Sequence, residues 1–203
     1  MQIIWYGESC FKIISGEISL LTDPFSPEKR GFKNPRFLAD LFLFSSFQEL
    51  DRRKERVNNF FSFFTPGEYE IKNIFIQGIP HQEKGVLKTI YLIELENIKI
   101  CFLSKISKFP SQEHLKKISK SEIILIPFNF ISKEGVGFIK GVQPKLVVPF
   151  DLFLTKEEKI PKVLEKFAQE IGSSKVEILE KLKIKKRDLS WEKSKLVILK
   201  PNI

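Results

Sequence analysis

Two residue types that build many catalytic sites are scarce in this chain. Its 203 residues include two histidines, His81 and His114, and two cysteines, Cys10 and Cys101. A dinuclear zinc site draws on several imidazole ligands, so two histidines are too few for a histidine-rich metal centre. Both cysteines lie in apolar, strand-like segments, which favours small buried hydrophobic residues.

Long apolar segments are also missing. No segment approaches the roughly 20 apolar residues that a membrane-spanning helix needs. The chain reaches Gly7 and Glu8 without the basic start and long apolar region of a signal peptide. We therefore expect a cytoplasmic protein without a membrane partner.

Positive charge is concentrated in the second half of the chain. The net charge is +9, and residues 101–203 contain 21 Lys and Arg against 12 Asp and Glu. The densest part is Lys181–Arg187. A basic segment of this kind can bind nucleic acid or an acidic partner. Because Lys outnumbers Arg and no aromatic stacking motif accompanies the segment, we favour a solvated face and keep nucleic-acid binding as the alternative.

Phenylalanine is unusually abundant, with 20 Phe against three Tyr. Phe is a bulky core and interface residue whose side chain needs no hydrogen-bond partner. The segment Phe60–Phe64 therefore predicts a buried strand. The alternative is an exposed apolar patch, which would suit a protein partner or a homodimer.

Apolar periodicity predicts a mixed α/β chain that forms one domain over residues 1–203. Short strands dominate the first half, with one short helix in residues 48–59. The strands are expected at Ile3–Tyr6, Cys10–Ile14, Ile18–Leu21, Leu41–Phe44, Phe60–Phe64, Glu68–Ile71, Ile74–Ile79, Ile90–Leu95 and Ile98–Leu103.

Strands and helices alternate in the second half. Strands are expected at Ile123–Pro127, Leu146–Pro149, Val176–Leu179 and Leu196–Leu199, and helices at residues 110–118, Gly135–Gly141 and Thr155–Ile171. Thr155 and Glu158 suit a capping box for the last helix, and Gly172 suits its end. Such an order can form two sheets packed face to face with helices outside.

Four segments match one known family in order and spacing. They are Ile4–Phe11 (IWYGESCF), Leu21–Phe25 (LTDPF), Ala39–Ser45 (ADLFLFS) and Pro66–Ile71 (PGEYEI). Together they resemble the first half of small metallo-β-lactamase-fold hydrolases of the L-ascorbate-6-phosphate lactonase branch. The resemblance covers roughly residues 1–150. It implies a four-layer αββα sandwich of two mixed β-sheets flanked by helices.

The resemblance also implies where metal ligands would lie, and this chain departs from it there. In the family the third segment continues into His-x-His-x-Asp-His, whereas here it continues into Ser46–Asp51. Ser46, Gln48 and Asp51 then occupy the positions of the three histidines. Leu50 occupies the position of the aspartate.

Other family positions are changed as well. Glu8 replaces a histidine, Lys105 replaces the carboxylate that bridges the metals, and Asp151 replaces the last histidine. His81 falls near one ligand position, and Asp23 matches a buried structural aspartate. Relatives bind zinc or manganese, and we expect no cofactor here because the ligands are replaced.

The replacements suggest a particular remnant. Lys105 can supply the positive charge that the metal supplies in relatives, so we expect it to pair with Asp51, Asp151 or both. After the strand Ile123–Pro127, Phe128-Asn129-Phe130 stands where relatives carry a Gly-Gly turn. Bulky phenylalanines there would fill space that a substrate needs.

Three functions follow from these patterns. The favoured one is a metallo-β-lactamase-fold pseudoenzyme, a hydrolase-like protein with a degenerate metal site that serves as a non-catalytic binding or scaffold module. The second is a metal-dependent hydrolase with an oxygen-ligated site built on Glu8, Asp51, His81 and Asp151, suited to Mg²⁺ or Ca²⁺. The third is a nucleic-acid-associated protein that uses its basic C-terminal third.

Overall fold

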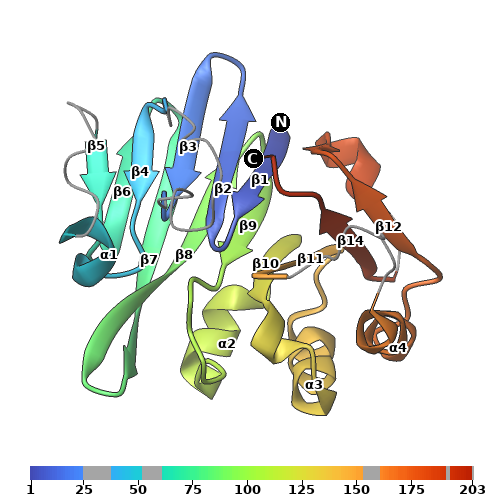
Figure 1. Ribbon diagram of the computed structural model, residues 1–203. Helices are drawn as coiled ribbons and strands as arrows, with labels where there is room; N and C mark the ends of the chain where they lie inside the picture. Colours follow the sequence, from blue (N-terminus) through green and yellow to red (C-terminus); the bar gives the residue numbers. More distant parts are fainter. Residues whose placement is uncertain (25–37, 52–60, 153–160, 191–192, 203) are drawn as a thin grey trace.

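The computed structural model describes residues 1–24, 38–51, 61–152, 161–190 and 193–202, with residues 50 and 51 described by their backbone alone. Two mixed sheets pack face to face (Figure 1). The six-stranded sheet has the order β13-β1-β2-β3-β4-β5. Its strands are β1 (Gln2–Gly7), β2 (Cys10–Ser15), β3 (Ile18–Thr22), β4 (Leu41–Leu43), β5 (Phe61–Phe63) and β13 (Leu182–Lys183).

The second sheet has eight strands in the order β12-β14-β11-β10-β9-β8-β7-β6. Strands β6 to β9 are antiparallel neighbours, whereas β9, β10, β11, β14 and β12 run parallel. Its strands are β6 (Gly67–Ile71), β7 (Ile74–Glu83), β8 (Val86–Leu95), β9 (Ile98–Phe102), β10 (Ile123–Pro127), β11 (Leu146–Phe150), β12 (Val176–Leu179) and β14 (Lys195–Leu199).

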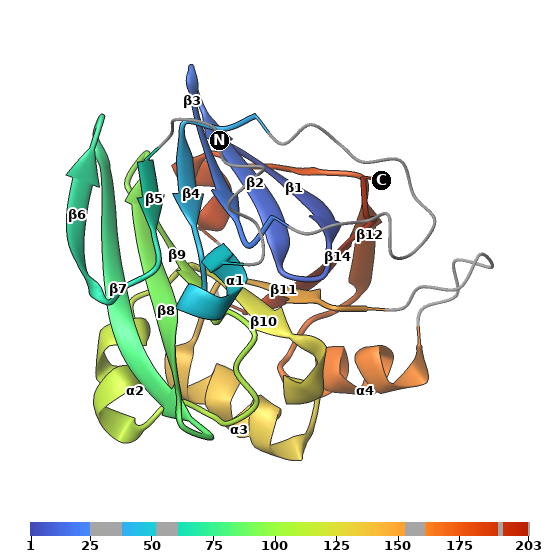
Figure 2. The same ribbon diagram turned by 60° about the vertical axis from the view of Figure 1, so that its left-hand side comes forward.

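Helices cover the outer face of the eight-stranded sheet. Figure 2 shows α2 (Gln112–Ile118), α3 (Lys133–Val142) and α4 (Lys162–Glu170) on the side of this sheet that faces away from the other one. The short helix α1 (Phe47–Asp51) lies at the end of β4 and β5. Within the described residues, no helix has the length and apolar character to cross a membrane.

The core lies between the sheets and under the helices. Strands β10 and β11 are buried at every position, as parallel central strands covered on both faces should be. Three fully buried rings, Phe11, Phe102 and Phe150, join the two sheets, with centroids 5.6 to 6.3 Å apart. Cys10 and Cys101 are buried, as predicted, and burial raises the pKa of the Cys101 thiol.

The predicted fold class is confirmed, and most predicted strands are present with shifted ends. Strands β7 and β8 extend further than predicted because Lys84 and Gly85 form a tight hairpin turn with φ of 48° and 78°. The turn at Glu96 and Asn97 was predicted, and both residues have positive φ.

Three predictions about local structure are corrected. The Phe-rich strand is not buried: β5 is an edge strand with a single neighbour, and Phe61 is 62% exposed, while Phe60 lies outside the described residues. Helix α4 begins at Lys162 after Pro161, and Thr155 and Glu158 lie outside the described residues. Strand β13 was missed because its two residues sit inside the basic segment Lys181–Arg187.

Candidate functional site

Backbone strain marks the ends of three strands. Asp23 follows β3, Ser104 follows β9 and Asp151 follows β11, with φ of 33°, 56° and 60°. Non-glycine residues rarely adopt this left-handed region, and in this chain they also do so at hairpin turns such as Lys84 and Glu96, so here it marks where the strands end. Glu8, in the turn between β1 and β2, has φ of 47°. These are the positions, or direct neighbours of the positions, where the sequence predicted a former metal site.

A buried polar chain joins the two sheets at this end. The Asp23 carboxylate accepts a hydrogen bond from the Ser45 amide at 2.7 Å, and the Ser45 carbonyl accepts one from the Thr89 amide at 2.8 Å. The Ser104 hydroxyl then donates to the Thr89 carbonyl at 2.5 Å. All four residues are buried. Buried polar groups that are satisfied in this way hold their elements in one arrangement.

Glu8 and Lys105 form an ion pair at the strand ends. Lys105 Nζ lies 2.6 Å from Glu8 Oε2, and the two side chains are 30% and 20% exposed. The Trp5 indole N–H donates to the Glu8 carbonyl at 2.8 Å, which helps to fix the turn. Lys105 occupies the position that the resemblance assigns to the bridging carboxylate, and Glu8 occupies that of a histidine in the family's first segment.

The expected partners of Lys105 were different. Among the described carboxylates, that of Glu8 is the one within 4 Å of the Lys105 ammonium, so the predicted pairing with Asp151 is wrong. The Asp51 side chain lies outside the described residues. The tight turn after β1 brings Glu8 across to the end of β9, and this tertiary contact was not visible in the spacing of the motifs.

A second, more deeply buried ion pair lies next to the first. Lys88 Nζ is 2.7 Å from Glu83 Oε2 and also donates to the Lys105 carbonyl. The other Glu83 oxygen accepts hydrogen bonds from the Ser107 amide at 2.8 Å and hydroxyl at 2.6 Å. The Glu83 side chain is 3% exposed. The network therefore fixes the loop that presents Lys105.

The electrostatics of Glu83 follow from these contacts. Burial raises its pKa, but the hydrogen bonds from Lys88 and Ser107 outweigh burial and lower the pKa to about 2. Glu83, Lys88 and Ser107 were not predicted from the sequence. The Lys84-Gly85 dipeptide is a hairpin signal that could have placed Glu83 and Lys88 near each other.

The remaining predicted site residues do not gather into a ligand set. Ser46 is buried, and its hydroxyl accepts from the Glu49 amide at 3.3 Å at the start of α1. Gln48 is exposed and Asp151 is half-buried. His81 is buried on β7, and its ring lies beside that of His114, which is half-buried rather than a fully exposed surface residue.

The described part of the chain contains no cluster of three or more metal-ligating side chains. There, no three side chains of His, Cys, Asp or Glu lie close enough together to hold a metal ion. The Lys105 ammonium further opposes a cation beside Glu8. The residues that the structure describes therefore do not fit the metal centre that the fold family implies.

The segment Phe128-Asn129-Phe130 forms a short 3-10 helix after β10. Phe130 is buried against Phe109 and Phe138, with ring centroids 4.1 and 6.2 Å away. A hollow of about 570 Å³ lies beside it, lined by Ser107, Lys108, Phe109, Asn129, Phe130, Ser132, Lys133 and Glu134. The Phe130 ring is therefore part of the core at this end of the sheet, and the expectation that it fills substrate space stays a prediction.

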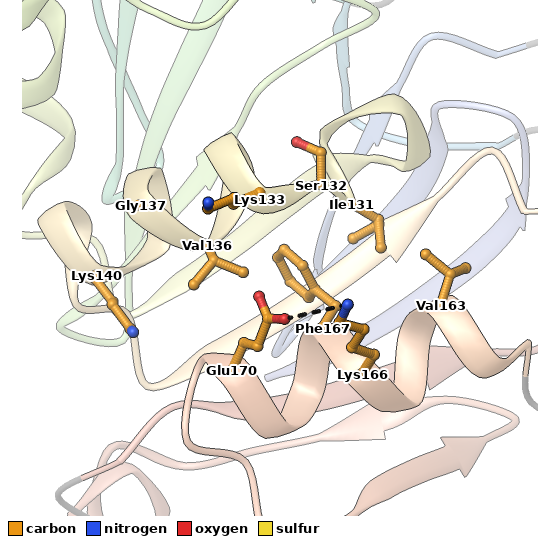
Figure 3. Close-up of a pocket in the computed structure, with 10 residues that line it drawn as sticks. All are labelled: Ile131, Ser132, Lys133, Val136, Gly137, Lys140, Val163, Lys166, Phe167 and Glu170. Carbon is orange, nitrogen blue, oxygen red and sulfur yellow. Dashed lines mark ion pairs between the residues drawn. The ribbon is translucent and has the colours of Figure 1, made fainter.

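A larger hollow of about 730 Å³ lies between α3 and α4 (Figure 3). Val136 and Phe167 form part of its apolar lining, and Lys166 at its rim pairs with Glu170 at 3.9 Å. It lies on the helical side of the eight-stranded sheet and includes none of the predicted site residues.

The basic segment Lys181–Arg187 forms an edge of the six-stranded sheet. Leu182 and Ile184 are buried, whereas Lys181, Lys183 and Lys185 are exposed. The two residues that follow are partly neutralised. Lys186 pairs with Glu122 and Arg187 with Asp188.

Comparisons with known proteins agree with this fold. The family described as beta-lactamase superfamily domain matches residues 2–151. A putative zinc-dependent hydrolase of the metallo-beta-lactamase superfamily from Thermotoga maritima superposes with a TM-score of 0.71 at 20% identity, covering 98% of this chain and 97% of that one. A search of the curated proteins found no match.

Two further solved structures share the fold at lower identity. A metallo hydrolase from Ignicoccus hospitalis has a TM-score of 0.62 at 12% identity, covering 98% of this chain and 95% of that one. A metallo-beta-lactamase fold protein from Bacillus subtilis has a TM-score of 0.64 at 9% identity, covering 100% and 98%. At these identities the likeness concerns the fold.

Proposed function

This chain belongs to the beta-lactamase superfamily, and we propose that it is a member without the metal chemistry of that superfamily, kept as a non-catalytic binding or scaffold module. The observation that carries the proposal is the ion pair between Lys105 and Glu8 at 2.6 Å. Hydrolases of this kind use a metal to generate a nucleophilic hydroxide. Here an ammonium group stands among the positions where that metal would need carboxylate and imidazole ligands.

The rest of the site supports the same conclusion. The buried chain from Asp23 to Ser104 joins the two sheets through hydrogen bonds, and Phe11, Phe102 and Phe150 join them through ring contacts. Within the described residues, the acidic groups are paired or dispersed rather than gathered into a ligand set. We also propose that the chain descends from the L-ascorbate-6-phosphate lactonase-like branch, on the strength of the segments around Glu8, Asp23 and Gly67.

Exposed apolar side chains on the six-stranded sheet give this module a candidate contact surface. Phe61 on the edge strand β5 and Phe47 at the start of α1 are both exposed. Large exposed apolar side chains at a sheet edge are typical of interaction sites. We propose a second copy of the chain as the partner, because one β5 edge can pair with another about a two-fold axis.

The metal proposal is tested on the full chain purified without chelators. We expect no zinc, manganese, iron or magnesium that depends on Glu8 or Asp151, and no turnover of lactone or phosphate-ester substrates. A near-stoichiometric metal that disappears in both Glu8→Gln and Asp151→Asn, with turnover lost in parallel, would overturn the proposal. The alternative of an oxygen-ligated hydrolase would then hold.

The partner proposal is tested by sedimentation equilibrium. We expect a concentration-dependent dimer that Phe61→Ser weakens. Phe75→Ser is the matched control, because Phe75 is also a partly exposed strand residue but lies on β7, which is not an edge strand. A monomer at all concentrations, or equal weakening by both variants, would contradict the β5 interface.

A further inference from the structure

The only two histidines of the chain lie beside each other in the fold. His81 is on β7 and His114 is on α2, 33 positions later in the sequence, and their ring centroids are 6.3 Å apart. The antiparallel β7–β8 hairpin and the helix α2 are thereby brought together at one point.

Each of the two rings has a nitrogen that nothing in the described structure satisfies. His81 Nε2 and His114 Nδ1 are both buried and have no hydrogen-bond partner among the described residues. His81 as a whole is 7% exposed. A buried polar atom left without a partner costs about 1–3 kcal/mol, so two such atoms in neighbouring rings point to an occupant.

We propose that His81 and His114 form a two-histidine site for a divalent transition metal that prefers imidazole, such as Cu²⁺ or Zn²⁺, with water completing the coordination. This site shares His81 with the positions that the resemblance assigns to family ligands, but its second ligand, His114, is not one of them, and it uses neither Glu8, Lys105 nor Asp151.

The spacing of the rings suits such an ion. Metal–nitrogen bonds of about 2.0–2.1 Å place the centroids of two imidazoles on one ion roughly 4.5 Å apart at a right angle, about 5.2 Å apart at the tetrahedral angle and about 6.4 Å apart when the two rings lie opposite each other. The observed 6.3 Å lies at the wide end of this span. The pair therefore fits an ion with two imidazoles opposite each other, as in square-planar Cu²⁺, whereas a tetrahedral Zn²⁺ would need the rings to approach by about 1 Å.

The charges around the pair also allow a cation. Burial lowers the pKa of His81, which favours the neutral imidazole that a metal ion needs. Glu83 favours positive charge here, whereas Lys88 and Lys108 oppose it. Lys88 is neutralised by its ion pair with Glu83, which leaves the Lys108 ammonium as the main opposing charge.

The test is calorimetric titration of the full chain, expressed without a histidine tag, with CuCl₂, ZnCl₂ and MgCl₂. We expect one Cu²⁺ or Zn²⁺ per chain, with Cu²⁺ binding more tightly, and no binding of Mg²⁺. His81→Ala and His114→Ala should each weaken binding at least about tenfold. Glu8→Gln is the control and should leave binding unchanged.

Two further readouts separate a site from surface adsorption. Bound Cu²⁺ should show coupling to two imidazole nitrogens in its paramagnetic resonance spectrum, and Zn²⁺ should raise the melting temperature of the native chain but not of His114→Ala. His114 is half-buried on a short helix, so this variant should fold even if His81→Ala does not. Binding that survives His114→Ala, or no binding up to about 1 mM metal, would overturn the proposal.

The test also distinguishes this proposal from the one on function. Metal lost on His114→Ala supports the two-histidine site and leaves the non-catalytic proposal standing. Metal lost on Glu8→Gln contradicts the non-catalytic proposal and leaves the histidine pair without support.

Discussion

Two ion pairs lie side by side in this molecule and differ mainly in burial. Glu83–Lys88 and Glu8–Lys105 have nearly equal N–O distances, 2.7 and 2.6 Å. The Glu83 side chain is almost inaccessible to water, whereas both members of the Glu8–Lys105 pair are partly solvated. Because solvent screens a partly exposed pair, equal distances do not mean equal contributions to stability.

The difference in burial suggests that the two ion pairs have different roles. The buried pair, with Ser107 attached, holds the loop that carries Lys105. We expect the partly exposed pair to balance charge at the strand ends and to support less of the fold. The substitutions below test this difference between the two pairs.

The largest effect is expected from Glu83→Gln. It removes the negative charge that neutralises Lys88 and weakens the bonds from Ser107, so the free energy of unfolding should fall by about 3 kcal/mol. Denaturant unfolding measures this. The control is Glu94→Gln, since Glu94 pairs with Lys99 at 3.4 Å on the surface of the same sheet. Loss of the Glu94–Lys99 pair should lower the free energy of unfolding by about 0.5 kcal/mol or less. Equal decreases in Glu83→Gln and Glu94→Gln would contradict the claim that burial makes the Glu83 pair stronger.

The contribution of the Glu83–Lys88 pair to stability should also depend on pH. The folded pKa of Glu83 lies below its ordinary value of 4.5, at about 2, so its stabilisation is complete above pH 4.5 and is lost as the pH falls toward 2. The shift corresponds to about 3 kcal/mol. Unfolding free energies measured between pH 6 and 2 should fall less steeply in Glu83→Gln. Asp40 and Glu96 also have lowered pKa values, through hydrogen bonds from Ser19 and from the N-terminal ammonium, so the variant should retain some slope.

A smaller effect is expected at the former metal position. Glu8→Gln and Lys105→Met should each cost about 1 kcal/mol or less, and a double-mutant cycle should give a coupling below about 1 kcal/mol that decreases in high salt. A coupling as large as the cost of Glu83→Gln would mean that the two pairs are energetically alike.

The smallest effect on stability is expected in the basic segment. Lys181, Lys183 and Lys185 are exposed, so replacing all three by Ala should change the free energy of unfolding by no more than about 0.5 kcal/mol. The same variant tests the nucleic-acid alternative. If that alternative holds, binding of single-stranded RNA will fall steeply with salt in the native chain and will be weaker in the variant. No binding at low salt would rule it out.

The sequence predicted the sheets better than the site. Alternating and continuous apolar segments place strands such as Cys10–Ser15 and Ile123–Pro127, because burial on one or both faces leaves a local pattern. The contact between Glu8 and Lys105 joins residues 97 positions apart and leaves no such pattern. The edge position of Phe61 was missed for the same reason, since apolar content alone does not say how many neighbours a strand has.

The left-handed backbone at Asp23, Ser104 and Asp151 has a consequence for protein engineering. Strand ends that already hold this backbone conformation offer a scaffold, because installing chemistry there requires new side chains rather than a new backbone. Glu8→His, Lys105→Asp and Asp151→His would begin to place metal ligands on two sheets that are already joined by buried hydrogen bonds. In that sense the molecule is a starting point for the directed evolution of a metal site by side-chain substitution alone.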